Sequence, residues 1–321
     1  MYDPGPDYNT GKCIPLHRNE NLFVDAGFLE NLVVEQVRNS TIFSYPQSSS
    51  YDLRAAIGKY HACSADEVYV GNGADGVLAD LFNYLREYYD EIGFQDFTYQ
   101  VYPFLCERYN FHKKKLNETN KIWVIDSPNA INGGVFDFKA VEKYPEYLIW
   151  DNVYGQYDSQ NELTCPHTAN YIRVHSFSKF FGLASLRIGY CIGNKGLIST
   201  LLARKDIFNV NTIAQKTAIA ALTQKDYFQS LLPQVVDSKK MLTKSLEELG
   251  FIVTKGRANF IWVTHSNLKM SDLQNELAKK GILVRRFEVE NLQNYLRITL
   301  PSLQIVDKLV MNIKHILEKI S

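Results

Sequence analysis

Four short runs of mainly apolar residues recur in the middle of the chain, and they constrain its fold more than any other feature. They are continuous rather than alternating, and they lie at 122–125 (IWVI), 147–150 (YLIW), 171–174 (YIRV) and 188–192 (IGYCI). Continuous runs are typical of strands buried on both faces, as in a parallel sheet covered by helices. An earlier run, Val68–Val70, leads through a glycine turn into helical spacing. We therefore predict an α/β fold with a mostly parallel sheet between helices.

The pattern changes after Gly250 to short strands mixed with amphipathic helices, which is typical of an α+β unit. Its expected strands are 251–254, 260–263, 282–285 and 295–300, followed or interrupted by helices at 271–280 and at the C-terminus. Earlier helices are expected at 52–60, 195–206, 212–224 and, as one long helix, 226–249. We predict an N-terminal arm (1–40) that packs with the small domain, a large α/β domain (41–228) and a small α+β domain (229–321). A cleft between two domains is a common ligand site.

The charge balance and the cysteines exclude several classes of protein. The 321 residues include 35 Lys+Arg and 35 Asp+Glu, so no net charge attracts nucleic acid or an anionic membrane. We expect the one basic run, Lys113–Lys115, to be a solvated loop or helix face. No 18-residue apolar run and no secretory signal is visible, which favours a cytoplasmic protein. The cysteines are odd in number and scattered, which favours free thiols over disulfides or a zinc site; they are Cys13, Cys63, Cys106, Cys165 and Cys191.

The segment 176–190 (SFSKFFGLASLRIGY) carries the most specific chemical signal. Lys179 follows a predicted strand and precedes an apolar stretch, whereas an ordinary lysine lies on the surface. Desolvation against apolar residues lowers the pKa of an amine and makes it nucleophilic enough to form an imine. Ser176, Ser178 and Arg187 add two hydroxyls and a guanidinium, which bind phosphate. An aldehyde cofactor with a phosphate group would use all four residues.

Pyridoxal phosphate is a cofactor of this kind, and it also needs a carboxylate opposite its ring nitrogen. Asp151 ends the predicted strand 147–150 at the expected carboxyl edge of the sheet, although an isolated aspartate there is more often a cap or turn residue. Tyr154, three residues later, would reach the phenolic oxygen of the cofactor.

Three further segments supply candidates that are weak individually. In 71–75 (GNGAD), a glycine turn leads into a helix, where the backbone N–H groups of Ala74 and Asp75 would bind phosphate; a plain left-handed turn is the alternative. Tyr99 is a candidate for stacking on the cofactor ring. Asn129 is a candidate for donating to its phenolic oxygen. These candidates gain weight because they occur together and in this order.

In this order, the segments GNGAD, FTYQVY, SPNA, DNVY, SFSKFFGLASLRIGY and YLRIT resemble the class I and II aminotransferases of fold type I, most of all the histidinol-phosphate aminotransferases. The similarity extends from 17–21 to 296–299. It implies an aspartate-aminotransferase-like fold and pyridoxal 5′-phosphate as the cofactor. The chain departs from the family at 129–133 (NAING), where Asn-Pro-x-Gly is usual, and the stretch 102–126 is short.

The resemblance implies a role for each matching residue around the cofactor. Lys179 would hold the cofactor covalently and move a proton, Asp151 would pair with the ring nitrogen, and Tyr99 would stack on the ring. Asn129 and Tyr154 would contact the phenolic oxygen. The phosphate would be surrounded by Ala74, Asp75, Ser176, Ser178 and Arg187.

The resemblance also implies a substrate end and a partner subunit. Arg297, helped by Arg285 or Arg286, would bind the substrate carboxylate or phosphate, and Asn21 is a weaker pocket candidate. Tyr45 matches a tyrosine that reaches the neighbouring subunit's phosphate site, which implies a homodimer with shared sites. The implied reaction is a ping-pong transamination between glutamate and a phosphorylated substrate, histidinol phosphate in the reverse direction.

Two alternatives remain open from the sequence. Decarboxylases of threonine or serine phosphate share the same lysine, aspartate and phosphate site, and an aminotransferase of another small phosphorylated or aromatic substrate fits equally well. A non-catalytic doubly wound domain that binds a nucleotide is the rival from another class, although no GxGxxG follows a strand. A yellow purified protein, in which borohydride attaches the cofactor to one lysine, would favour the enzyme over the binding domain.

Overall fold

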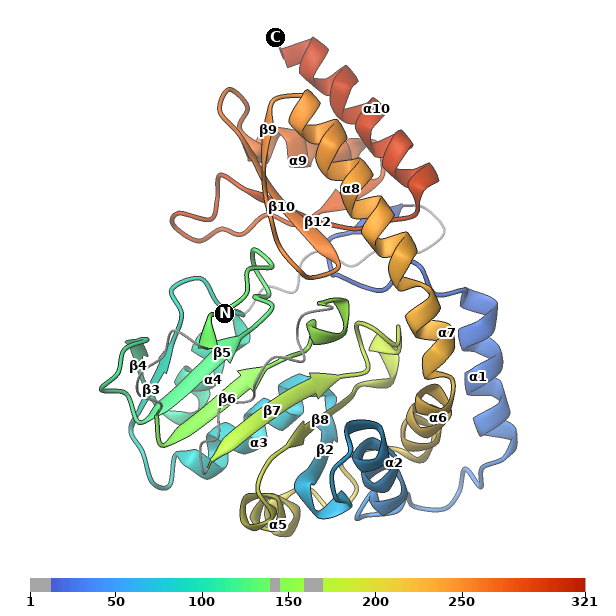
Figure 1. The fold of residues 1–321 in the computed structure, drawn as a ribbon, viewed down its shortest axis with the longest axis vertical. Helices are drawn as coiled ribbons and strands as arrows, with labels where there is room; N and C mark the ends of the chain where they lie inside the picture. The colour runs from blue at the N-terminus through green and yellow to red at the C-terminus, as the bar shows by residue number, and fades with distance from the viewer. Residues whose placement is uncertain (1–12, 139–144, 159–169, 321) are drawn as a thin grey trace.

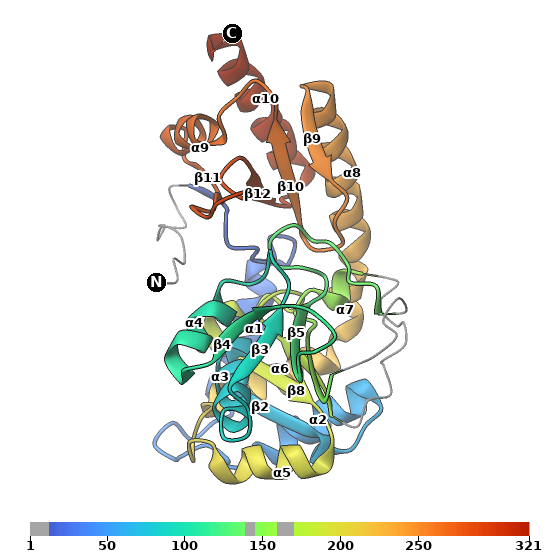
Figure 2. The ribbon, with the colours of Figure 1, turned by 90° about the vertical axis from the view of Figure 1, so that its left-hand side faces the viewer.

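The computed structural model describes residues 13–138, 145–158 and 170–320. It has a larger part built on a seven-stranded sheet and a smaller C-terminal part that stands above it in Figure 1. Helix α8 (Leu232–Glu248) runs from the smaller part towards α7 (Lys225–Ser230) at the side of the larger one. Figure 2 shows the same two parts from the side, one above the other.

The central sheet has the strand order β2-β8-β7-β6-β5-β3-β4. Its strands are β2 (Val68–Asn72), β3 (Glu91–Phe94), β4 (His112–Lys115), β5 (Ile122–Asp126), β6 (Tyr147–Asp151), β7 (Tyr171–Ser176) and β8 (Ile188–Ile192). The neighbours from β4 to β7 are parallel, and β8 is antiparallel to both β7 and β2. The predicted α/β fold with a mostly parallel sheet is therefore confirmed, and the carboxyl ends of β5, β6 and β7 lie at one edge.

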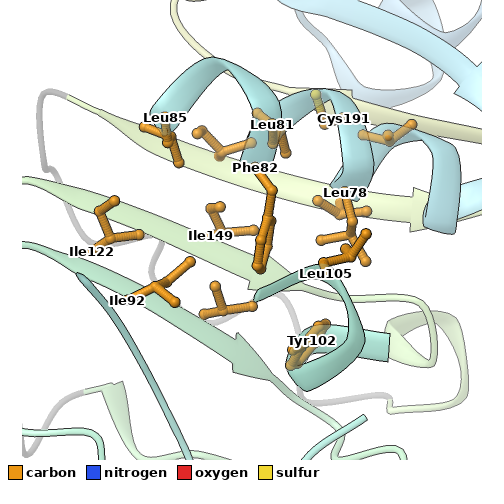
Figure 3. Packing of buried hydrophobic residues seen from close by; sticks show 14 of the residues in the cluster. Leu78, Leu81, Phe82, Leu85, Ile92, Tyr102, Leu105, Ile122, Ile149 and Cys191 are labelled. Carbon is orange, nitrogen blue, oxygen red and sulfur yellow. The ribbon is translucent and has the colours of Figure 1, made fainter. Parts of the chain in front are cut away.

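Helices cover both faces of this sheet. One face carries α3 (Gly73–Leu85), α4 (Val101–Tyr109) and α5 (Lys195–Arg204). Figure 3 shows Leu78, Leu81 and Phe82 of α3 against the strands, with the Phe82 ring directed at Ile149 of β6. The other face carries α1 (Ala26–Arg38), α2 (Tyr51–His61) and α6 (Thr212–Thr223). Each large apolar side chain buried in this way contributes about 1.5–3 kcal/mol, so both layers hold the strand ends firmly.

The smaller part contains a second, antiparallel sheet in the order β12-β10-β9. Its elements are β9 (Phe251–Thr254), β10 (Phe260–His265), α9 (Met270–Lys279), β11 (Ile282–Val284), β12 (Leu296–Thr299) and α10 (Leu303–Ile320). The long helix predicted over 226–249 is in fact two helices, α7 and α8, which are separated at Leu231. Pro233 lies in the first turn of α8, where its missing N–H is tolerated, whereas inside a continuous helix its ring would clash with the preceding turn.

The N-terminal arm contacts both parts rather than the small one alone. Strand β1 (Ile14–Leu16) pairs in parallel with β11 of the smaller part. Helix α1 instead packs beside α6, where Leu32 joins the core of the larger part. The residues between these two elements are thereby held at the junction, with His17 and Asn19 almost completely buried.

The structure corrects the sequence expectation for the basic run at 113–115. The basic run Lys113–Lys115 is neither a loop nor a helix face, because it forms most of the edge strand β4 and all its residues are exposed. Lysines on an edge strand disfavour pairing with another sheet. The described cysteines are all free thiols, while Cys165 lies outside the described residues. Within the described ranges, no helix combines the length and apolarity that a bilayer crossing requires.

Candidate active site

A cavity of about 480 Å³ lies where the carboxyl ends of β5, β6 and β7 face the smaller part and the N-terminal arm. Of the predicted site residues, only Asn21, Tyr45, Asn129 and Arg286 do not line it. The eleven that do are Ala74, Asp75, Tyr99, Asp151, Tyr154, Ser176, Ser178, Lys179, Arg187, Arg285 and Arg297. The fold thus brings together residues from four segments of the larger part and two of the smaller part.

Lys179 follows β7 and enters the cavity from the sheet side. Its Nζ donates a hydrogen bond to the carbonyl oxygen of Arg18 in the arm (2.8 Å) and lies 5.8 Å from the centre of the Tyr154 ring. Burial and, to a smaller extent, the nearby Arg297 guanidinium lower the pKa of the Lys179 amine to about 8. A substantial fraction of this amine is therefore neutral near pH 8, which is the form that attacks an aldehyde.

Asp151 ends β6 and is only 5% exposed. Its Oδ2 accepts a hydrogen bond from Tyr102 Oη (2.7 Å), and its Oδ1 accepts one from the Val153 N–H (3.2 Å). Burial raises the pKa of this carboxyl to about 7, although the Tyr102 hydrogen bond opposes the rise. A buried carboxylate of this kind is stabilised by a cationic partner, such as a protonated ring nitrogen.

An anion-binding site forms where α3 begins. The helix starts at Gly73, so the N–H groups of its first turn, at Ala74 and Asp75, point away from the helix and towards the cavity. The guanidinium of Arg187 lies beside them and pairs with Asp75 Oδ2 (2.8 Å). The buried Ser178 Oγ has no hydrogen-bond partner among the described residues. Ser176 Oγ accepts from the Ser178 N–H (3.0 Å) and completes the site.

Two glycines allow this close approach. A Cβ at Gly73, which has φ +75°, would lie 2.6 Å from an Arg187 guanidinium nitrogen. A Cβ at Gly189 of β8 would lie 2.3 Å from the Ala74 nitrogen. Any side chain at either position would therefore displace the start of α3 or the guanidinium.

The opposite end of the cavity is cationic. Arg297 on β12 donates to the carbonyl oxygens of Ala130 (2.6 Å) and His17 (3.1 Å), and its guanidinium lies over the rings of Phe260 and Phe287. Arg285 lines the cavity beside it and is 8% exposed. Arg286, the other arginine considered from the sequence, does not line the cavity and pairs with Glu288.

Asn129 does not face the cavity. It is buried in a turn, where its Nδ2 donates to the Phe97 carbonyl (2.7 Å) and to Asp126 Oδ1 (3.1 Å). Its Oδ1 accepts from the backbone N–H groups two and three residues later in the chain. The neighbouring Ala130 lines the cavity in its place. The predicted contact of Asn129 with the phenolic oxygen is therefore not supported by its position.

Asn21 and Tyr45 also lie outside the cavity lining. Asn21 Nδ2 donates to the Phe180 carbonyl (2.7 Å) and its Oδ1 caps the Phe23 N–H (3.1 Å), so this side chain fastens the arm to the larger part. Tyr45 is 81% exposed and stacks on Phe208, with ring centroids 4.6 Å apart.

Several cavity residues were missed from the sequence. Arg18 and His17 act through carbonyl oxygens, which no residue type reveals. Asp126 is different, because it ends an apolar strand just as Asp151 does. The sequence therefore carried a signal for Asp126 that the shorter predicted strand 122–125 left out.

Comparison with known protein families matches almost the whole sequence to one family model. The family described as aminotransferase class I and II matches residues 11–313. The chain belongs to the class I and II aminotransferases. This membership confirms the predicted pyridoxal-phosphate-dependent aminotransferase. The amine of Lys179, the carboxylate of Asp151 and the anion site at α3 are the donor set that pyridoxal phosphate requires.

Relatives of this aminotransferase cover nearly its whole length. It is 32% identical to histidinol-phosphate aminotransferase 1 of Hydrogenovibrio crunogenus, over 93% of this chain and 90% of the relative. It is 31% identical to histidinol-phosphate aminotransferase 1 of Oceanobacillus iheyensis, over 99% and 95%.

Solved structures share its fold at lower identity. The histidinol-phosphate aminotransferase of Sinorhizobium meliloti, in complex with pyridoxal-5′-phosphate, has a TM-score of 0.87 at 19% identity, over 96% of this chain and 92% of the other. The L-threonine-O-3-phosphate decarboxylase of Porphyromonas gingivalis has a TM-score of 0.81 at 17% identity, over 95% and 99%. At these identities the likeness concerns the fold, which both activities share.

Proposed function

We propose that this aminotransferase transfers an amino group between histidinol phosphate and 2-oxoglutarate. The observation that carries the proposal is the two-ended cavity, with the nucleophilic amine of Lys179 between an anion site at α3 and the guanidinium groups of Arg285 and Arg297. One end fits the cofactor phosphate, and the other fits the phosphate of the substrate or a carboxylate of glutamate. The names of the relatives point to the same substrate.

Each residue then has a definite task. Bound pyridoxal phosphate supplies an aldehyde that takes up the amino group and a ring that withdraws electrons from the substrate Cα–H bond. Lys179 Nζ would take the proton from the substrate Cα and deliver it to the former aldehyde carbon of the cofactor, so the half-reaction would need no external base. Asp151 would keep the ring nitrogen protonated by remaining ionised. Ser176, Ser178 and Arg187 would hold the cofactor phosphate, and Tyr99 would pack against the ring.

Product analysis tests the proposed reaction. The purified enzyme with histidinol phosphate and 2-oxoglutarate is expected to form glutamate in equal amount to the amine consumed. Threonine phosphate or serine phosphate is expected to release no carbon dioxide. Release of carbon dioxide without glutamate formation would instead assign the chain to the decarboxylases, which share this fold.

We also propose a homodimer whose subunits complete each other's sites, acting in the cytoplasm. Tyr45 does not line the cavity of its own chain. Its ring stacks on Phe208, which brings two exposed apolar segments together. Their exposed apolar residues are Ile42 (67% exposed), Phe43 (94%), Tyr45 (81%), Ile207 (68%) and Phe208 (43%). A contiguous exposed apolar surface is typical of a protein–protein interface. Pairing of this surface with a second copy would carry the Tyr45 hydroxyl towards the other subunit's phosphate site.

Mixing two impaired variants tests the shared site. Lys179→Ala and Tyr45→Ala are each expected to be impaired, because each lacks a group that every site needs. In a hybrid dimer, one of the two sites receives both intact residues. Random pairing after unfolding and refolding the two variants together makes about half of the dimers hybrids. The mixture is therefore expected to recover up to about a quarter of wild-type activity. Refolding either variant alone serves as the control. No recovery in a mixture shown to contain hybrid dimers would contradict a shared site.

A further inference from the structure

Asp151 has two buried neighbours that sequence analysis did not single out. Tyr102 on α4 is fully buried, and its Oη donates to Asp151 Oδ2 (2.7 Å). Asp126 ends the adjacent strand β5, is 2% exposed, and is the cross-strand partner of Asp151 in the parallel register. One neighbour is therefore a hydrogen-bond donor and the other a second carboxyl group.

These two neighbours have opposite electrostatic effects on a carboxylate. A hydroxyl that donates to the charged form stabilises it, and a second carboxylate nearby destabilises it. Consistent with this, the Tyr102 hydrogen bond lowers the pKa of Asp151 and the charge of Asp126 raises it. Burial raises the pKa of Asp126 itself to about 6, so this group is largely ionised at neutral pH.

Asp126 is held in place by hydrogen bonds from several donors. Its Oδ2 accepts from the Ala130 N–H (2.7 Å), and its Oδ1 accepts from Thr98 Oγ1 (3.0 Å) and Asn129 Nδ2 (3.1 Å). These bonds connect the loop that carries Tyr99 to the turn whose Ala130 carbonyl holds Arg297. The carboxylate is therefore fixed beside Asp151 rather than free to turn towards solvent.

The other titratable groups around Asp151 come from three elements. Asp75 of α3 raises the pKa of Asp151 more weakly than Asp126, and it is paired with Arg187. Tyr154, in the segment after β6, accepts a hydrogen bond from Asn19 Nδ2 (2.9 Å) rather than contacting Asp151. Lys179, after β7, donates to the arm. Tyr102 and Asp126 are thus the neighbours whose removal changes Asp151 most directly.

We propose that Tyr102 and Asp126 are opposing positioning residues for Asp151, Tyr102 favouring its carboxylate form and Asp126 limiting it. The proposal rests on the proposed role of Asp151 as the partner of the cofactor ring nitrogen. Because that nitrogen carries a proton, the cofactor binds tightly only while Asp151 is ionised. Affinity for pyridoxal phosphate is therefore lost as the pH falls through the pKa of Asp151.

Cofactor affinity measured against pH tests the role of Tyr102. The apoprotein is titrated with pyridoxal phosphate between pH 5.5 and 8.5, and the acid midpoint is the pH at which the affinity is half lost on acidification. Tyr102→Phe is expected to move this midpoint up by about one pH unit. It is also expected to raise the dissociation constant at neutral pH about tenfold, as for the loss of a hydrogen bond to a charged group. Tyr69→Phe is the matched control, because Tyr69 is also fully buried and donates to a carboxylate, Asp80 (2.6 Å), away from the cavity. It is expected to leave the midpoint unchanged.

The charge of Asp126 is tested by the opposite shift. Asp126→Asn removes the neighbouring negative charge and is expected to move the acid midpoint down by about one pH unit. A shift of one pKa unit corresponds to a tenfold change in the protonation equilibrium of Asp151. If this variant does not fold, Asp126→Ser replaces it, because serine removes the charge and keeps a polar side chain in the turn. A purely structural role would weaken binding at every pH and move neither midpoint.

The outcomes separate this proposal from the function on which it rests. Midpoints that move in opposite directions support it, and midpoints that stay or move together overturn it. Asp151→Asn is measured alongside. If Asp151→Asn leaves cofactor affinity and its pH dependence unchanged, the proposed role of Asp151 fails; if it alters them while Tyr102→Phe does not, only the present inference fails.

Discussion

Lys179→Ala is expected to reduce transamination by more than about 10⁴-fold, the largest effect of any single substitution in this chain. The side chain is both the covalent attachment point of the cofactor and the proton carrier, and proton transfer by a positioned group alone contributes about 10²–10⁴-fold. Formation of glutamate from histidinol phosphate and 2-oxoglutarate measures the loss. Bound cofactor is expected to remain, because Asp151 and the anion site at α3 are intact.

A second buried lysine provides the control for this variant. Burial also lowers the pKa of Lys239 to about 8, and its Nζ donates to the carbonyl oxygens of Gly256 (3.0 Å) and Ala258 (2.6 Å), outside the site cavity. Lys239→Met is therefore expected to keep activity within a few-fold of wild type. Activity of Lys179→Ala within tenfold of the wild-type enzyme would remove the lysine from the mechanism.

Asp151→Asn is expected to lower kcat about 10³-fold. Removing one member of a buried charge pair costs about 3–5 kcal/mol, which corresponds to a factor of 10² to 10⁴. Asparagine keeps an oxygen that accepts from Tyr102, so the shape of the site is preserved while the charge opposite the ring nitrogen is lost. Steady-state kinetics with saturating substrates measures the change.

Asp80→Asn is the matched control for Asp151→Asn. Asp80 is a half-buried carboxylate that accepts from a buried tyrosine hydroxyl, as Asp151 does, but it does not line the cavity. Its replacement is expected to affect stability more than kcat. An equal loss of kcat in the two variants would show that the effect of Asp151 is structural.

The elements predicted correctly from sequence are those whose pattern is local. Strands β5, β6 and β7 are buried on both faces, so their apolar runs stand out against the polar segments around them. Helix α1 was not predicted, because it buries only Leu32 and leaves Val34 and Val37 exposed, which weakens its apolar stripe. Strand β4 was not predicted either, because all its side chains are polar and exposed and give no apolar pattern.

The same distinction applies within the site. Lys179, Asp151 and Arg187 were found because their residue types in this order already specify a chemistry. Asn129 was assigned to the pocket, yet its contacts with Phe97 and Asp126 turn it away and leave Ala130 at the wall. Which of two adjacent residues faces a cavity depends on tertiary contacts of the turn, and these are not encoded in the local pattern.

The arm shows a third limit. Its contribution to the site consists of the Arg18 and His17 carbonyl oxygens, which bind Lys179 and Arg297. Backbone groups are the same in every residue, so only the path of the chain between β1 and α1 places them. The resemblance to a known family identified this segment as part of the similarity without revealing how it acts.

Borohydride trapping tests most directly whether the Lys179 amine and the Asp151 carboxylate form one pyridoxal phosphate site. The protein is incubated with one equivalent of cofactor per chain, reduced, digested and mapped by mass spectrometry. We predict one phosphopyridoxyl group per chain, on Lys179, and a strongly reduced yield in Asp151→Asn. A label on Lys239, or spread over surface lysines with Lys179 unmodified, would contradict the account.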